Sequence, residues 1–209
     1  HLQTEAKMKG LSPNPKEAFA MSEYQGTFKR YEKKYLVTQQ QYNALAKVFA
    51  ARMVPDRFAE STISNIYYDT PDFRLIRRSL DRPAYKEKLR LRTYRTPGAD
   101  TEAFVEIKKK YDHIVYKRRI AMTYGEAQAY LDGGAAPEQS QISREIDWFL
   151  QFYKGIQPAM CICYDRLALF DKYQPELRVT FDSGIRWRMD DLDLSSGSAG
   201  EHLLPHDTC

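Results

Sequence analysis

The chain has 209 residues, of which 43% are hydrophobic and 29% are charged, a balance typical of a folded protein and not of a disordered one. Lysine and arginine total 32 and aspartate and glutamate total 28, so the formal net charge is only +4. No run approaches the roughly 18 apolar residues of a membrane span, and the polar first residues do not form a signal peptide. We therefore expect no transmembrane segment in this chain.

The N-terminal half begins with residues 1–26, which show no hydrophobic periodicity and are expected to form a flexible leader to a single domain over 27–209. A strand over about 28–37 is expected to lead into a helix, because Thr38 and Gln41 form a capping box ahead of apolar residues at helical spacing. Further strands rich in aromatic and β-branched residues are expected at about 62–69, 85–94, 103–109 and 113–121.

The C-terminal half begins with a second capping box, Thr123 with Glu126, which predicts a short helix. An apolar stripe predicts a third helix over about 141–153. Three more strands are expected at about 159–169, 174–181 and 184–189. Most connections between strands are too short for helical crossovers, so an α+β fold with a mainly antiparallel sheet, closed as a barrel or stacked as a sandwich, is predicted.

The cysteines indicate in which cellular compartment the protein is expected. The chain has three cysteines, an odd number that does not indicate a disulfide framework. Cys161 and Cys163 are two apart in a predicted strand, so both thiols are expected on one face as small apolar side chains. Free buried cysteines are typical of a reducing compartment, and we expect a cytoplasmic location.

The strands place basic residues on one face. Because residues i and i+2 of a strand share a face, Lys88, Arg90 and Arg92 lie on one side of their strand and Leu89 and Leu91 on the other. A charged strand face is usually a solvated surface, but one sign recurs here on at least four strands. Neighbouring like charges are unfavourable unless a polyanion compensates them. If the sheet closes with this face inward, the sequence predicts a basic tunnel for a phosphate chain.

Seven motifs occur in an order that resembles one known family. They are RYEKKYLV (30–37), ISNIYYDTPDF (63–73), KLRLRTY (88–94), FVEIKKK (104–110), VYKRR (115–119), YDRLALF (164–170) and LRVTFDSGIRWR (177–188). Over about residues 28–209 the chain resembles the vacuolar transporter chaperone (VTC) domain, the polyphosphate polymerase branch of the CYTH-like triphosphate tunnel metalloenzymes. The resemblance implies an antiparallel eight-stranded β-barrel with about three flanking helices. It also implies ATP-dependent polyphosphate synthesis with a divalent metal, Mn²⁺ or Mg²⁺.

The resemblance also implies roles for individual residues. The catalytic clamps on the transferred phosphates would be Arg90, Arg92, Lys108, Lys117, Arg166 and Arg178. Further phosphate contacts would come from Arg30, Lys34, Lys88 and Arg119. Glu106 and Glu32 are the carboxylates in the chain that could hold the metal. Hydrolytic relatives begin with E-x-E-x-K, whereas here Arg30 replaces the first glutamate, which argues against an ordinary triphosphatase.

The end of the chain departs from the family pattern. The family continues after a leucine-proline stretch, here 203–205, into a strand whose L-E-x-K glutamate is the main metal ligand. This sequence ends at Cys209. We therefore expect the domain to lack its C-terminal strand, with the main metal glutamate lying beyond Cys209.

Two other functions stay open: a tripolyphosphatase or nucleoside triphosphatase, and a non-catalytic module that binds polyphosphate or nucleotide. The expected partners are ATP or another triphosphate and polyphosphate. Nucleic-acid binding is not expected, because it needs an exposed groove with interleaved aromatic side chains. Any membrane association would come through a partner protein.

Overall fold

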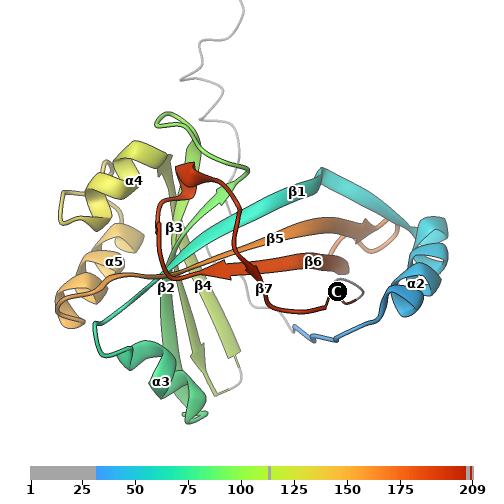
Figure 1. Ribbon diagram of the computed structural model, residues 1–209, viewed down its shortest axis with the longest axis horizontal. Coiled ribbons are helices and arrows are strands. Elements are labelled where there is room, and N and C mark those ends of the chain that lie inside the picture. The colour runs from blue at the N-terminus through green and yellow to red at the C-terminus, as the bar shows by residue number, and fades with distance from the viewer. Residues whose placement is uncertain (1–31, 113, 206–207, 209) are drawn as a thin grey trace, which may run out of the picture.

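A computed structural model describes residues 32–112, 114–205 and 208, with the backbone alone at 57–59. Arg30 and the expected leader over 1–26 lie outside these residues. In the described part the strands form one antiparallel sheet in the order β4-β3-β2-β1-β5-β6-β7 (Figure 1). Its strands are β1 (Met53–Asp69), β2 (Tyr85–Tyr94), β3 (Glu102–Tyr111), β4 (Ile114–Thr123), β5 (Gln157–Asp171), β6 (Arg178–Arg188) and β7 (Glu201–His202).

Four α-helices and one short 3₁₀-helix accompany the sheet in the described residues. They are α2 (Gln39–Arg52), α3 (Arg74–Leu80), α4 (Tyr124–Leu131), α5 (Gln141–Phe152) and η2 (Leu194–Ser196). Helices α4 and α5 lie together near the β3 and β4 end of the sheet, whereas α2 lies at the far end of β5 and β6 (Figure 1). The α+β class and the antiparallel sheet are therefore confirmed.

The apolar face of the sheet carries the hydrophobic core. Leu89 of β2 and Ile107 of β3 are fully buried and belong to one cluster with Ile146 and Phe149 of α5. Because α4 and α5 cover this face, the alternate residues of β2 and β3 point to the other side of the sheet. The predicted division of the strands into an apolar and a basic face is thus confirmed.

The three expected helices are present and their caps explain where they begin. Thr38 and Thr123 each accept a hydrogen bond from the backbone N–H three residues later, and Gln41 and Glu126 complete the two capping boxes. Ser140 caps α5. The cysteine prediction is also confirmed, because Cys161 and Cys163 are free and buried on β5.

Some strand predictions were wrong. Residues 32–37 form no strand, because Tyr35 and Leu36 remain largely exposed and their alternation buries no face. The two strands expected at 174–181 and 184–189 are one strand, β6, which continues through Gly184 at a positive φ of 55°. In the described residues the sheet has seven named strands, and no pairing between β4 and β7 closes it by hydrogen bonds.

Candidate functional site

The register of three strands builds a row of charge on the face opposite to the core. Glu106 of β3 lies opposite Arg90 of β2 on one side and Arg119 of β4 on the other. In the next row Lys108 pairs with Lys88 and Lys117 in the same way. The basic face predicted from strand alternation therefore exists, with one carboxylate at its centre.

Glu106 is only 1% exposed, and cations from two neighbouring strands surround it. The Arg90 Nε donates to its Oε2 at 2.6 Å, and the Lys117 Nζ lies 2.6 Å from its Oε1. Arg119 and Arg92 complete the shell at 3.8 and 4.0 Å. Four cationic side chains thus share a single buried carboxylate, which leaves a local excess of positive charge. We call these five residues the Glu106 cluster.

Charge in the cluster dominates the titration of its members. Burial alone would raise the pKa of Glu106, but the positive charges of Arg90, Arg92 and Lys117 together lower it to about 2. Burial lowers the pKa of Arg119 to about 10 and also lowers that of Lys117. At neutral pH Glu106 is ionised, and the surplus positive charge of its partners is available for an anionic ligand.

Neutral acceptors hold the guanidinium groups in place. Arg92 donates to the Asn65 Oδ1 at 2.9 Å and to the Tyr164 hydroxyl at 3.0 Å. Arg90 donates to the Tyr67 hydroxyl at 3.2 Å. Sequence reasoning missed these acceptors, although Asn65 and Tyr67 share the face of Arg90 and Arg92 by strand alternation. These two guanidinium groups are therefore held in place before any ligand binds.

The structure places the other predicted site residues at different distances from this centre. Lys108 lies in the row beside the cluster, and its Nζ is 3.3 Å from the Glu32 carboxylate. The same carboxylate is 3.7 Å from the Nζ of Lys34. Arg166 of β5 forms a bidentate pair with Asp182, at 2.6 and 2.7 Å. Lys88 is partly buried, and burial lowers its pKa.

Arg178 does not join the Glu106 cluster. It begins β6 opposite Phe170, four residues along the strand from the Arg166–Asp182 pair, and its side chain is exposed. Four residues of strand correspond to about 13 Å. The sequence motif alone could not show this separation.

The two carboxylates predicted to hold a divalent metal, Glu106 and Glu32, do not fit one. Both oxygens of Glu106 already contact cations, Oε2 at 2.5 Å from the Arg90 Nη2 and Oε1 at 2.6 Å from the Lys117 Nζ. A metal ion would add to an existing excess of positive charge. Glu32 is engaged with Lys34 and Lys108. Within the described residues, no three histidine, cysteine, aspartate or glutamate side chains are grouped as metal ligands.

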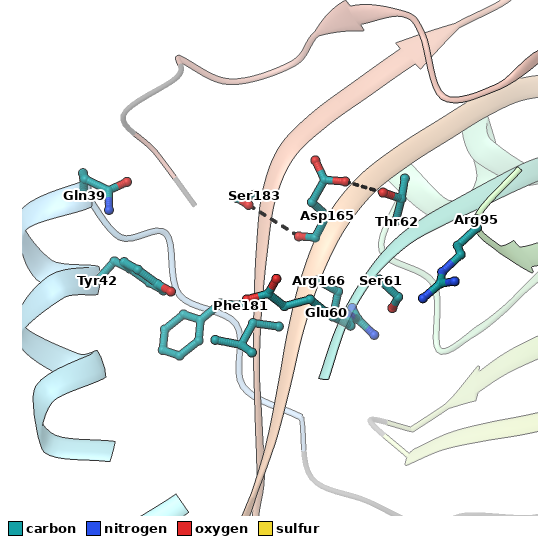
Figure 2. A pocket seen from close by; sticks show the side chains of 11 residues that line it. Gln39, Tyr42, Glu60, Ser61, Thr62, Arg95, Asp165, Arg166, Phe181 and Ser183 are labelled. Atoms are coloured by element: carbon teal, nitrogen blue, oxygen red, sulfur yellow. Dashed lines mark hydrogen bonds between the residues drawn. The ribbon is translucent and has the colours of Figure 1, made fainter. Parts of the chain in front are cut away.

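A pocket of about 630 Å³ opens beside this face, between α2 and strands β1, β5 and β6 (Figure 2). Arg166 contributes to its lining, so the pocket adjoins the basic face. The remaining lining residues are Gln39, Tyr42, Glu60, Ser61, Thr62, Arg95, Asp165, Leu167, Phe181 and Ser183.

Comparison with known proteins agrees with the sequence motifs. A family model described as "VTC domain" matches residues 29–207. The chain therefore belongs to the VTC domain family, as its motifs indicated. None of the curated proteins compared with the sequence matches it.

Among solved structures, the fold is similar to that of a Bacillus halodurans protein provisionally named an adenylate cyclase. The two are 14% identical with a TM-score of 0.48, and the match covers 76% of this chain and 82% of that one. Separately, none of the helices in the described part of the chain combines the length and hydropathy that a membrane span requires.

Proposed function

We propose that this protein is an ATP-dependent polyphosphate polymerase that transfers the γ-phosphoryl group of ATP to phosphate or to a growing polyphosphate chain. The observation that carries the proposal is the Glu106 cluster, in which four prepositioned cations face one carboxylate. Membership in the VTC domain family supports it. The side chains of Arg90, Lys117 and Arg119 are 15%, 27% and 18% exposed, so a ligand can reach them, whereas that of Arg92 is buried.

The proposed chemistry asks the protein for positioning and charge neutralisation. In the transfer, the bond between the γ-phosphorus and the oxygen bridging to the β-phosphate breaks, ADP leaves, and a terminal oxygen of the chain forms the new bond to phosphorus. The transferred group spreads negative charge over its equatorial oxygens. In the proposal Arg90 and Arg92 would use their remaining N–H groups to bind phosphate oxygens, and Lys117 would supply a point charge. No side chain has to act as nucleophile.

Neighbouring rows would carry the rest of the phosphate chain. In the proposal Lys88, Lys108 and Arg119 extend the basic surface across β2, β3 and β4. Arg166 and Arg178 on the β5–β6 side and Lys34 would contact the donor or the product at the ends of this surface. Arg30 would also contact phosphate in the proposal, although it lies outside the described residues.

A divalent cation, Mn²⁺ or Mg²⁺, remains part of the assay conditions because the family resemblance implies one. We assign no metal ligand among the described residues, since Glu106 does not fit that role. The cytoplasmic location and membrane association through a partner protein are likewise proposals, which fractionation of cells that express the chain would test.

The test incubates the purified protein with ATP, with and without Mn²⁺ or Mg²⁺. We expect long polyphosphate on a gel and one ADP for each phosphate incorporated. Arg90→Ala should abolish the product, whereas Arg118→Ala should not, because Arg118 points to the opposite face and contacts Glu145 of α5. Release of free phosphate alone would support a tripolyphosphatase or nucleoside triphosphatase instead. Tight tripolyphosphate binding without turnover would support a binding module.

A further inference from the structure

The pocket beside α2 differs in chemistry from the basic face that it adjoins. Its volume of about 630 Å³ lies within the range of small-molecule sites. Besides the two arginines Arg95 and Arg166, the pocket contains acceptors and aromatic rings, which the Glu106 cluster lacks on its cationic side. The carboxylate of Glu60 and the amide of Gln39 line it, together with the rings of Tyr42 and Phe181, whose centroids are 4.8 Å apart (Figure 2).

The pocket and the cluster are joined by a short path of contacts. Arg92 of the cluster donates to the Tyr164 hydroxyl at 3.0 Å, and the guanidinium of Arg166 lies 5.1 Å from the centre of the Tyr164 ring. Arg166 then lines the pocket. Along β1, Asn65 pairs with Arg92, and the pocket residue Ser61 lies four residues away on the same face, about 13 Å. A single extended ligand can therefore reach both places.

Arg95 is one of the two arginines that line the pocket. It follows β2 in a left-handed backbone conformation, with φ of 72°, and its backbone N–H donates to the Thr62 carbonyl at 2.8 Å. Such a conformation is costly for a residue other than glycine, and residues held in it are concentrated at functional sites. Here it places the Arg95 side chain at the pocket, beside Ser61 and Arg166 (Figure 2).

We propose that this pocket binds the nucleoside part of a nucleoside triphosphate whose phosphates lie on the Glu106 cluster. This inference rests on the proposed function, because it assumes that the donor is a nucleotide. Tyr42 would contact the base, and Glu60 would accept hydrogen bonds from the ribose hydroxyls. Arg95 and Arg166 would lie beside the phosphate nearest the ribose. Inorganic tripolyphosphate, which has no nucleoside, would use the cluster alone.

The experiment compares ATP with inorganic tripolyphosphate by titration calorimetry. Tyr42→Ala and Glu60→Gln should each weaken ATP binding about tenfold and should leave tripolyphosphate binding within twofold. The first removes a base contact, and the second replaces the ionised ribose acceptor by a neutral and weaker one. Tyr42→Phe keeps the ring and should retain the ATP affinity of the original chain. Tyr173→Ala and Glu138→Gln, which alter exposed residues outside the pocket, serve as matched controls.

The outcomes separate this inference from the function on which it rests. If Tyr42→Ala and Glu60→Gln leave ATP binding unchanged, or weaken ATP and tripolyphosphate equally, the nucleoside pocket is wrong while phosphate binding on the basic face stands. If the unaltered chain binds neither ligand, the proposed function itself fails. Glu60→Gln changes an exposed side chain, so the test does not depend on whether the Tyr42→Ala variant keeps α2 in place.

Discussion

A carboxylate as deeply buried as Glu106 loses several kcal/mol of hydration, and only nearby cations can offset that loss. Its partners are unfavourable on their own, because four adjacent cations on two strands, β2 and β4, repel one another. The carboxylate and the four cations therefore stabilise one another, and the remaining positive charge is held in place for a ligand. On this view Glu106 positions Arg90 and Lys117 and does not itself touch the substrate.

The pKa of Glu106 makes this role measurable. Its value of about 2 lies below the ordinary 4.5, so ionised Glu106 stabilises the fold by about 3 kcal/mol above pH 4.5, and this contribution is lost as the pH falls toward 2. Glu106→Gln lacks the contribution at every pH. We expect its free energy of unfolding in urea to be about 3 kcal/mol lower at pH 7, with the difference shrinking toward zero near pH 2.

A matched control is available in the same sheet. Glu87 is also buried, but it accepts hydrogen bonds from Tyr85 and Tyr153 on the core side. Glu87→Gln should therefore leave tripolyphosphate binding unchanged, whereas Glu106→Gln should alter it. A constant stability difference between Glu106→Gln and the unaltered chain from pH 7 to pH 2 would contradict the assigned role.

At the scale of elements, α3 depends on a side chain that precedes it. The helix begins after Phe73, which has a left-handed backbone and provides no side-chain cap. Asp69, at the end of β1, supplies the acceptors instead. Its Oδ1 accepts from the N–H of Leu75 at 2.8 Å, and its Oδ2 accepts from that of Ile76 at 3.0 Å. A buried carboxylate thus satisfies amides that the helix leaves free.

Replacing Asp69 by Asn turns one of these acceptors into a donor that faces a backbone N–H. We expect Asp69→Asn to lower the free energy of unfolding by about 1–2 kcal/mol, and to speed hydrogen exchange at Leu75 and Ile76. Asp72→Asn is the control, because Asp72 is exposed and its described side-chain bond is to the Thr70 hydroxyl. Equal losses in the two variants would show that Asp69 is not the cap.

The same contrast explains how much of the fold the sequence could predict. Thr38 and Thr123 predict where their helices begin, because each capping residue and its partner lie only three residues apart in the sequence. The acceptor of α3 lies outside the helix, at the end of a strand, and seven residues carry too little periodicity to reveal it. A strand over about 28–37 was expected from the residue pattern, but in its described part, 32–37, no strand of the described residues pairs with it.

The candidate site, like the fold, could be predicted from the sequence only in part. Strand alternation predicts which side of β2, β3 and β4 each charge takes, because a period of two needs no tertiary information. Which charges meet depends on register, and register places Glu106 between Arg90 and Arg119. The identity of Glu106 as a carboxylate suggested a metal ligand, and only its neighbours show that cations already occupy it.

At the scale of the whole molecule, the formal charge of +4 conceals a separation between two faces. One face of β2, β3 and β4 carries the Glu106 cluster and the lysine row beside it. The other face packs under α4 and α5, and there Lys109 and Arg118 are both paired with Glu145. A ligand attracted only by net charge would not distinguish the two faces, whereas a ligand bound to the basic row would.

Lys108 and Lys109 provide the sharpest test of that distinction. They are adjacent on β3, point to opposite faces, and form comparable ion pairs, with Glu32 at 3.3 Å and Glu145 at 3.5 Å. Changing either to alanine lowers the formal net charge from +4 to +3. We expect Lys108→Ala to weaken tripolyphosphate binding by about 1–2 kcal/mol at low salt, and by less as salt screens the charge. Lys109→Ala should change it less than twofold. Equal weakening in the two variants would mean that net charge, and not this face, attracts the phosphate.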